Sequence, residues 1–465
     1  MNTREPLEEL IRDPRDFEHD LTFPAPDRLR IYDSTLRDGE QMPGVAFSPE
    51  VKYEIALRLS EIGVHIIDVG FPAVGPSERR ALGLILGAKR RGELRSDLEI
   101  LVMCRSTRAD VDATLEVLEE LGEPPDAVTF FIFTAASDLH IKYKLGRSLL
   151  AREGKDQKQW LDLPVQWYRQ ANLRMLCDVI AYCRSRGVGS IEYGGEDGSR
   201  ANLDYIIQIH QQGHRAGGTR PSTPDTVGCY TPYSVKQLIP KIRLALPELP
   251  LVIHFHNDLG LGAINTVTGI GCGAEIFCTT INGLGERSGN ASMHQVVCVL
   301  KYLFGVEIPG FRYQLLGPLA RFLERASGIP VQSTEPIIGH SVFAHESGIH
   351  TAGMLIHPKI YEVIPSAEVG GTSHFVYGKH SGGMVVEHAL RRQRERLQAA
   401  GVDLSDELVG RTLREIKRLR EQRAADGGHD QSVERYYRDL DGLGLNEEEV
   451  VDLAVSLGRA PSLSD

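Results

Sequence analysis

The chain has 465 residues, of which 42% are hydrophobic and 25% are charged, and its formal net charge is −11. This is the composition of an ordinary soluble protein of about two or three domains. The acidic balance argues against a nucleic-acid partner and an anionic membrane surface, and no apolar run reaches the roughly 18 residues that a membrane span needs. The seven cysteines are scattered without a CxxC pair, which favours buried free thiols and a cytoplasmic location.

The N-terminal segment, residues 1–28, is acidic and polar. It lacks the apolar core of a signal peptide and does not resemble a transit peptide. We expect a leader that is partly helical at best.

A regular alternation of strand and helix patterns follows this leader. Short runs rich in β-branched and aromatic residues occur at 29–34, 65–71, 98–104, 127–134, 190–195, 221–228, 251–256 and 275–282. Amphipathic helical patterns lie between them, for example at 49–62 and 173–186. Ser48-Pro49 and Thr231-Pro232 each combine an N-cap residue with proline at the first helical position. Eight alternations over about 290 residues predict an α/β fold, a (β/α)8 TIM barrel at 29–310.

The alternative fold is a doubly wound open sheet. No GxGxxG motif follows the first predicted strand, which weakens a dinucleotide-binding version of that fold. After residue 310 the alternation ends. We expect a linker or subdomain at 311–385, helical at 311–329 and then rich in glycine and histidine, and a charged helical region at 386–465 with breaks at 401, 425–428 and 442–444. The charged region is either a solvated face or a dimerisation surface.

Polar residues gather where the predicted strands end, which is where TIM barrels carry their active sites. The seventh strand ends in His254-Phe255-His256, and alternation along a strand points both imidazoles the same way. An isolated HxH pair is more often a surface or core pair than a metal site. Here, however, Arg37 and Asp38 follow the first strand, and Asn290 follows the eighth.

Two imidazoles and a carboxylate, with open positions for water or substrate, suit a divalent ion. Asp38 is the best-placed carboxylate, and Asn290 is either a weaker fourth ligand or a turn-forming residue. Arg37 would offer hydrogen bonds to a carboxylate or an oxyanion, unless it forms a surface salt bridge.

These residues lie within a series of motifs that occur in order: DSTLRDGEQMPGVAF, GVHIIDVGFPAVG, SDLHIKYKLG, GGEDGSRA, DTVG, HFHNDLGLGAINT, INGLGERSGNAS and FAHESGIHTAG…GKHSGG. Over about 29–385 the chain closely resembles the metal-dependent acetyl-CoA condensing enzymes, the isopropylmalate, homocitrate and citramalate synthases of the DRE-TIM metallolyase superfamily. From GVAF through GGEDGSRA to HESGIH, its motifs are most similar to those of bacterial homocitrate synthases of the nitrogen-fixation type.

The resemblance implies a divalent metal (Mg²⁺, Mn²⁺, Co²⁺ or Zn²⁺) held by Asp38, His254 and His256, with Asn290 as the weaker ligand. It also implies a 2-oxo acid substrate and acetyl-CoA as co-substrate. Arg37 would stabilise the oxyanion that forms on the keto oxygen, and the substrate contacts would include Thr226, on the carboxylate, and Gln41.

The resemblance further implies a Claisen-type condensation that ends in a 2-substituted malate and CoA, the reaction of an acyltransferase. The base that deprotonates the acetyl methyl group would be His350, supplied by the partner subunit of a homodimer. Glu196 and Tyr361 would support the base and the thioester end. Without the resemblance, His350 could not be chosen among the neighbouring histidines, and His345 is its rival.

The residues expected to contact the side chain of the 2-oxo acid differ from those of the family. Homocitrate synthases of the lysine pathway carry Arg and Ser on the fifth strand, where this chain has Glu192 and Gly194, and isopropylmalate synthases often carry His on the fourth, where it has Thr129. Basic residues that could bind a second anionic group are Lys142, Lys144 and Arg147, unless they belong to an exposed loop. Alternatives to a homocitrate synthase are therefore isopropylmalate, citramalate, 2-phosphonomethylmalate and 2-phosphinomethylmalate synthases. The absence of a second long α/β segment after GKHSGG argues against leucine feedback and an isopropylmalate synthase.

Two other classes of function compete with the synthase. A hydroxymethylglutaryl-CoA lyase would need a cysteine in the glycine-rich loop after the eighth strand, and the loop at 283–289 has none. An inactive metal-binding scaffold would not need the complete set of candidate catalytic residues.

Overall fold

The computed structural model describes residues 10–17 and 19–425. The chain forms two compact units. The first comprises the described residues of Met1–Met42 and Ala46–Ala326, and the second those of Pro43–Val45 and Ser327–Asp465.

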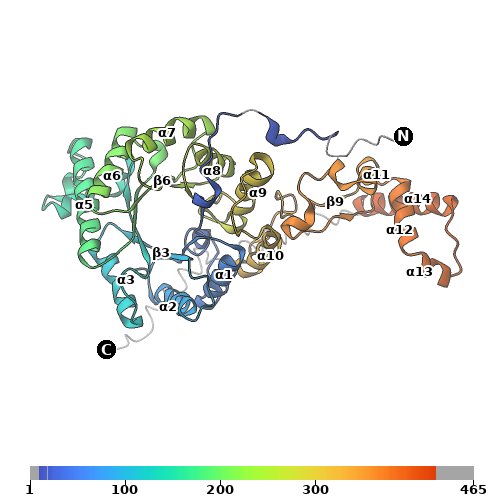
Figure 1. Ribbon diagram of the computed structural model, residues 1–465, viewed down its shortest axis with the longest axis horizontal. Helices are drawn as coiled ribbons and strands as arrows, with labels where there is room; N and C mark the ends of the chain where they lie inside the picture. The colour runs from blue at the N-terminus through green and yellow to red at the C-terminus, as the bar shows by residue number, and fades with distance from the viewer. Residues whose placement is uncertain (1–9, 18, 426–465) are drawn as a thin grey trace. The chain divides into compact units, whose positions relative to one another are not determined.

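The first unit is a closed barrel of eight parallel strands in sequence order (Figure 1). The strands are β1 (Arg30–Asp33), β2 (Ile66–Asp68), β3 (Glu99–Arg105), β4 (Thr129–Ala135), β5 (Ile191–Glu196), β6 (Arg220–Asp225), β7 (Val252–Phe255) and β8 (Ile276–Thr279). β1 closes the barrel because Asp33 lies opposite Ile67 of β2 and Thr279 of β8. The TIM-barrel prediction is confirmed.

Helices follow the strands in alternation along the chain. They are α1 (Pro49–Ile62), α2 (Pro76–Arg90), α3 (Arg108–Leu121), α4 (Gly146–Arg152), α5 (Val165–Ser185), α6 (Leu203–Arg215), α7 (Pro232–Ala245), α8 (Gly262–Gly271) and α9 (Met293–Phe304). A further helix, α10 (Leu316–Ser327), falls within the predicted helical stretch at 311–329, and most of it belongs to the first unit. The division between the units therefore falls after residue 326, whereas the sequence placed the end of the barrel domain at 310.

Local sequence explains where the helices begin. The Ser48 side chain accepts a hydrogen bond from the Val51 backbone N–H, and Pro49 occupies the first turn of α1, as an N-cap followed by proline requires. Thr231 accepts from the Ser234 N–H in the same way at the start of α7. Helix α5 begins at 165 rather than at the expected 173, after Pro164.

Five strands end earlier than the apolar runs suggested, whereas β3, β4 and β5 each end one residue later. After β2 the backbone turns at Gly70, which has a φ of 129°, and after β8 it turns at Asn282, which has a φ of 57°. Neither conformation continues a strand. The residues that follow the strands therefore form the loops at the mouth of the barrel.

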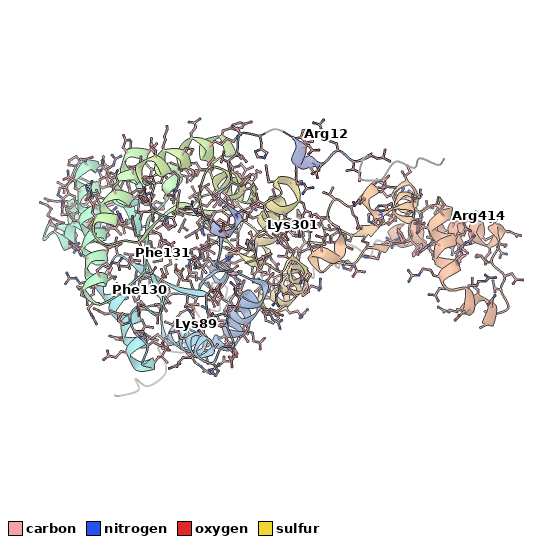
Figure 2. The ribbon with its side chains drawn as sticks, in the orientation of Figure 1. Arg12, Lys89, Phe130, Phe131, Lys301 and Arg414 are labelled. Carbon is pink, nitrogen blue, oxygen red and sulfur yellow. The ribbon has the colours of Figure 1, made fainter. Side chains whose placement is uncertain are left out.

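The barrel interior is filled by side chains from alternate strand positions. One hydrophobic cluster of the interior consists of Tyr32, Ile66, Leu101, Phe131, Val252, Ile276 and Cys278. The neighbouring residues Phe130 and Phe131, both labelled in Figure 2, occupy opposite faces of β4, and only Phe131 belongs to this cluster. All seven cysteines are free, and four of them are buried.

The described part of the N-terminal segment contacts the barrel unit. The Thr22 N–H donates to the Gly271 carbonyl at the end of α8 over 2.7 Å. Phe23 lies with its ring centroid 5.0 Å from that of Phe304 in α9. Short 3₁₀ turns occur at Pro14–Asp16 and Pro26–Arg28.

The second unit combines a small sheet with helices. Parallel strands β9 (Ala344–His345) and β10 (His374–Phe375) pair with each other. Its helices are α11 (Gly348–Ile356), α12 (Gly383–Arg392), α13 (Arg394–Ala399) and α14 (Asp406–Ala425). The expected break at Gly401 is present, whereas the expected break at 442–444 and the helical pattern beyond 425 lie outside the described residues. Among the described helices, none is long and apolar enough to cross a membrane.

A buried lysine supports the loops that follow β1 and β2. Lys52 of α1 is 1% exposed and pairs with Glu40, at 2.6 Å, and with Glu78. These carboxylates accept backbone N–H groups of Phe47 and Phe71. We expect Lys52→Met to destabilise the protein by about 3 kcal/mol, because the change leaves two partly buried carboxylates without their cation.

Thermal unfolding tests this expectation. Lys52→Met should lower the Tm clearly, while Lys241→Met, which changes an exposed lysine, should alter stability by less than about 0.5 kcal/mol. Equal Tm values for the two variants would show that the buried pair does not support the fold.

Candidate active site

One cavity of about 340 Å³ opens where the strands end. Its walls come from strand interiors and from the loops after β1, β4, β6 and β8. The lining residues are Tyr32, Arg37, Asp38, Gln41, Met103, Phe131, Phe133, Lys144, Glu192, Glu196, Ser222, Pro224, Thr226, His254, His256, Glu286 and Arg287. Seven residues expected in the site from the sequence line this one cavity: Arg37, Asp38, Gln41, Glu196, Thr226, His254 and His256.

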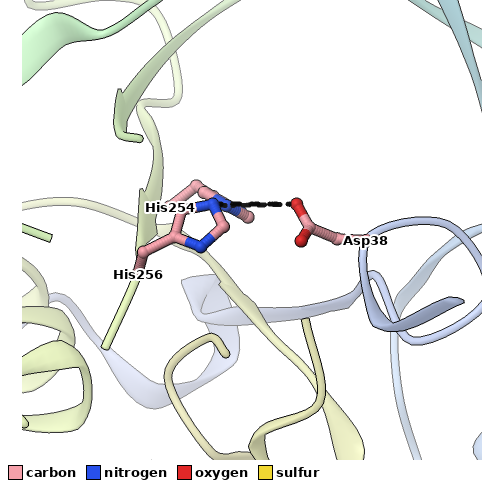
Figure 3. A group of neighbouring side chains, drawn as sticks. All are labelled: Asp38, His254 and His256. Carbon is pink, nitrogen blue, oxygen red and sulfur yellow. Dashed lines mark hydrogen bonds and ion pairs between the residues drawn. The ribbon is translucent and has the colours of Figure 1, made fainter. Parts of the chain in front are cut away.

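Figure 3 shows the imidazoles of His254 and His256 facing the carboxylate of Asp38. The two Nε2 atoms lie 3.1 Å apart. The Oδ2 atom of Asp38 lies 3.6 Å from Nε2 of His254 and 3.8 Å from Nε2 of His256. An octahedral ion with bonds of about 2.1 Å places neighbouring ligand atoms about 3 Å apart, so a small inward movement of these side chains would complete one face of such a site.

The surroundings of the three residues also fit a metal ion. Asn290 is buried, and its Nδ2 donates to Oδ1 of Asp38 over 3.0 Å, while its Oδ1 has no hydrogen-bond partner among the described residues. A Cβ atom at Gly285 would overlap the Asn290 amide, so glycine lets the loop after β8 approach the site closely. Asn290 is thus placed to serve as the weaker ligand that the sequence suggested, or to orient Asp38.

Electrostatics keep His254 and Asp38 in protonation states that can bind a metal ion. Burial, and then neighbouring His256, lower the pKa of His254 to about 3, so its imidazole is neutral and offers a lone pair. Burial alone would raise the pKa of Asp38, but Arg37 and the two histidines outweigh burial and lower it. Asp38 is therefore a carboxylate at neutral pH.

Arg37 lies at the edge of this site. Its Nε donates to Oδ2 of Asp68 and its Nη1 donates to Oδ2 of Asp38, each over 2.7 Å. Nη2 makes no hydrogen bond that involves the described residues, and the side chain is 10% exposed. Burial alone would lower the pKa of Arg37, but the two carboxylates raise it. A fixed cation with free N–H bonds next to a metal site can stabilise negative charge on a substrate oxygen.

Thr226 lies on the same rim, in the loop after β6. Its hydroxyl oxygen accepts the Asp197 backbone N–H over 2.8 Å, which leaves the hydroxyl proton available to a carboxylate. The guanidinium of Arg287 donates to the Thr226 carbonyl and pairs with Asp258 at 2.7 Å. Gln41 is exposed at the cavity mouth.

Glu196, at the end of β5, is partly exposed in the cavity. Lys144 donates to both of its carboxylate oxygens, at 2.9 and 2.6 Å. Lys142 and Arg147, the other basic residues expected near a second anionic group, do not line the cavity. Lys142 donates to the Leu163 carbonyl, and Arg147 stacks on Trp160.

His350 and Tyr361 lie in the second unit, and their rings stack with centroids 4.2 Å apart. Both side chains are exposed. The rival histidine, His345, is buried, and its Nε2 lies 3.3 Å from Oε1 of Glu362. Its exposure makes His350 a better candidate than the buried His345 for a base that meets a substrate.

Two functional positions escaped the sequence reasoning. Asp68 is fully buried at the end of β2, where it accepts from Arg37 and from Ser34 over 3.0 Å. Its signal was a single carboxylate that ends an apolar strand, Ile66-Ile67-Asp68. Arg287 lies in the glycine-rich loop after β8, in which the sequence suggested a role only for Asn290. Thr129, considered as a specificity position, begins β4 and donates to Glu99 over 2.6 Å, away from the cavity.

Two family models match the chain. Residues 28–307 match the model described as HMGL-like, and residues 337–424 match the model described as homocitrate synthase post-HMGL domain-like. The first match contains the whole barrel and its cavity, and the second contains His350 and Tyr361.

Two synthases are similar to this chain over most of their length. A homocitrate synthase of Methanopyrus kandleri is 35% identical over 86% of this chain and 89% of its own. A 2-isopropylmalate synthase of Sulfolobus acidocaldarius is 34% identical over 85% of this chain and 91% of its own. Among solved structures, the HMG-CoA lyase of Bacillus subtilis aligns with a TM-score of 0.51 and 18% identity over 68% of this chain and 98% of its own, which supports the barrel fold.

Proposed function

Because the chain belongs to the HMGL-like family and, within it, to the 2-isopropylmalate, homocitrate and citramalate synthases, we propose that it condenses acetyl-CoA with a 2-oxo acid. The products are a 2-substituted malate and CoA. The observation that carries this proposal is the set of Asp38, His254 and His256 beside Arg37 in one cavity at the mouth of the barrel.

Asp38, His254 and His256, with Asn290 as a weaker ligand, hold the divalent ion. The ion, when bound, supplies Lewis-acid polarisation of the keto carbonyl. The chain's own residues orient the 2-oxo acid. The Thr226 hydroxyl donates to the substrate carboxylate, Gln41 covers it at the mouth, and Arg37 donates to the keto oxygen as negative charge develops there.

The nucleophile comes from acetyl-CoA, whose methyl group is a weak carbon acid and needs a positioned base. Both histidines that line the cavity belong to the metal site. We assign proton removal to His350, with its ring held by Tyr361, and assign Glu196 to the thioester end of the site. The barrel of one subunit receives His350 from its partner in a homodimer.

The condensation begins with proton removal and ends with hydrolysis of the thioester. His350 removes a methyl proton, and the resulting enolate carbon forms a bond to the keto carbon of the 2-oxo acid. The carbonyl π electrons move to the keto oxygen, which is stabilised by Arg37 and takes up a proton to become the tertiary hydroxyl. Water then cleaves the thioester, giving the free carboxylate and CoA.

Cleavage of a hydroxymethylglutaryl-type thioester is the competing reaction on the same fold. Residues 283–289 contain no cysteine, and the chain carries the additional region that contains His350. Both features favour condensation over the lyase reaction.

Release of free CoA tests the proposal. Purified protein, acetyl-CoA and a panel of 2-oxo acids are incubated with Mg²⁺, Mn²⁺ or Co²⁺, and thiol is measured with and without EDTA. We expect release that depends on both the oxo acid and the metal. The panel includes 2-oxoglutarate, 2-oxoisovalerate, pyruvate, oxaloacetate and phosphonopyruvate. The absence of oxo-acid-dependent CoA release with every member of the panel would refute the proposed condensation.

A further inference from the structure

A buried carboxylate forms part of the floor of the cavity. Glu192, Gly194 and Glu196 share the inner face of β5, and Glu192 lies four residues before Glu196, roughly 13 Å away along the strand toward the barrel interior. Glu192 lines the cavity and is 0% exposed. A side chain that extends from C3 of a bound 2-oxo acid into the barrel therefore approaches Glu192.

Glu192 belongs to a chain of alternating charges across the barrel. Its Oε2 accepts from Nε of Arg220 over 2.8 Å, and Nη1 of Arg220 lies 2.7 Å from Oε1 of Glu99. Glu99 pairs in turn with Arg30 at 3.0 Å. With Glu192 ionised, two arginines and two glutamates balance each other. The remaining Nη2 of Arg220 is buried without a hydrogen bond among the described residues, but Arg220 does not line the cavity.

The second oxygen of Glu192 has no partner. Oε1 is buried without a hydrogen bond among the described residues. Burial raises the pKa of Glu192 to about 7, although Arg220 opposes this shift, so Glu192 is mainly a carboxylate acceptor above that pH. A buried acceptor without a donor is costly, and a ligand that supplies the donor recovers that free energy.

The part of the cavity wall that β3 and β4 contribute is apolar, whereas Tyr32 and Ser222 add hydroxyl groups elsewhere on the wall. Phe131 lies opposite Glu192 in the register of β4 and β5, and Phe133 lies opposite Gly194. Met103 of β3 lies opposite Phe131. These side chains line the cavity and suit an aliphatic chain rather than a charged one.

The cations of the cavity lie nearer its mouth and already have anionic partners. Arg37 pairs with Asp38 and Asp68, Lys144 pairs with Glu196, and Arg287 pairs with Asp258. None of the three contacts Glu192. Above about pH 7, where Glu192 is ionised, a carboxylate or phosphonate at the far end of the substrate would meet the unpaired oxygen of Glu192 without a compensating charge.

From this geometry we infer that Glu192 determines specificity, selecting 2-oxo acids whose aliphatic side chain ends in an uncharged hydrogen-bond donor such as a hydroxyl, and rejecting those that end in an anion. The inference rests on the proposed function and names the substrate class of that site. It disfavours 2-oxoglutarate, the substrate expected of a homocitrate synthase.

Three substrates that share their first four carbons test the inference. They are 2-oxopentanoate, 5-hydroxy-2-oxopentanoate and 2-oxoglutarate, which place a methyl, a hydroxymethyl and a carboxylate group at the fifth carbon. Concentrations refer to the open-chain keto form, measured by NMR. Two quantities are compared for the wild type: kcat/KM, and the affinity measured by calorimetry without acetyl-CoA. Both should be higher for 5-hydroxy-2-oxopentanoate than for 2-oxopentanoate by about tenfold or more. Both should disfavour 2-oxoglutarate by at least about 100-fold relative to the methyl compound.

A matched pair of variants separates selectivity from structural support. Glu192→Gln, which keeps the shape and removes the charge, should raise the ratio of 2-oxoglutarate to 2-oxopentanoate activity at least about tenfold. Glu99→Gln alters the same charge chain at a residue that does not line the cavity, and it should leave that ratio unchanged. The ratio is independent of a general loss of active protein, and circular dichroism checks the fold.

The outcomes distinguish this inference from the proposed function. Preference of the wild type for 2-oxoglutarate over both other acids, or an unchanged ratio in Glu192→Gln, would overturn the inference while the condensation stands. The absence of both binding and CoA release with all three acids, and with the wider panel, would overturn the proposed function itself.

Discussion

Replacement of His256 by alanine is expected to abolish metal binding at the cavity and to reduce kcat by about 10³-fold or more while the fold is kept. The expectation follows from the geometry, because Nε2 of His256 lies 3.1 Å from Nε2 of His254 and 3.8 Å from Asp38. Loss of one of three ligands leaves a site too weak to hold the ion that polarises the substrate, which is worth several kcal/mol in the transition state.

Two measurements check this prediction. Calorimetric titration with Mn²⁺ reports metal binding, and CoA release reports activity. His214→Ala serves as the control, because His214 hydrogen-bonds the Gly218 carbonyl at the end of α6 and lies outside the cavity. Retention of metal binding and full activity by His256→Ala would contradict the ligand assignment.

Replacement of His350 by alanine is expected to spare binding of the metal and the 2-oxo acid but to slow the reaction by about 10²- to 10⁴-fold, the usual contribution of a general base. The diagnostic measurement is exchange of the acetyl methyl protons of acetyl-CoA with D₂O in the presence of the 2-oxo acid, which reports proton removal alone. His340→Ala changes another exposed histidine of the same region and should exchange normally. Undiminished exchange in His350→Ala would exclude His350 as the base.

Mixing the two inactive variants tests which subunit supplies the base. In a homodimer that exchanges His350 between subunits, a heterodimer of His256→Ala and His350→Ala contains one intact site, so random mixing should restore about one quarter of the wild-type activity. If each subunit used its own His350, no mixed dimer would contain an intact site, and the mixture would remain inactive.

The sequence predicted the fold and the grouping of Asp38, His254 and His256. Eight short apolar runs, separated by helices with recognisable N-caps such as Ser48, are sufficient to specify a barrel, and the ends of its strands then converge by topology. His254 and His256 point the same way because strand alternation requires it, and Asp38 reaches them because β1 and β7 both border β8.

Long-range partners were harder to predict. Asp68 is the single carboxylate of an otherwise apolar strand and holds Arg37, so its role depends on which strands are neighbours in space. Lys142 and Arg147 shared a basic motif with Lys144, but only Lys144 lines the cavity, since the other two side chains contact the Leu163 carbonyl and the Trp160 ring. Sequence gives the composition of a loop but not the direction of each long side chain.

Substrate specificity depends on the same kind of long-range pairing. From sequence, Glu192 was simply a departure from an expected arginine. The proposed role of Glu192 depends on Arg220, which lies opposite Glu192 on β6 and hydrogen-bonds only one of the two carboxylate oxygens. That partial neutralisation is a property of the barrel interior and has no signature in either strand alone.

The most direct test of the central claim is to follow the acetyl carbon into the product. The protein is incubated with acetyl-CoA labelled with ¹³C at the methyl carbon, a 2-oxo acid and Mn²⁺, and the products are analysed by mass spectrometry. We expect a labelled 2-substituted malate that forms at the same rate as free CoA and does not form when EDTA is present. Release of CoA with labelled acetate as the sole carbon product, or label incorporation that is indifferent to EDTA, would contradict it.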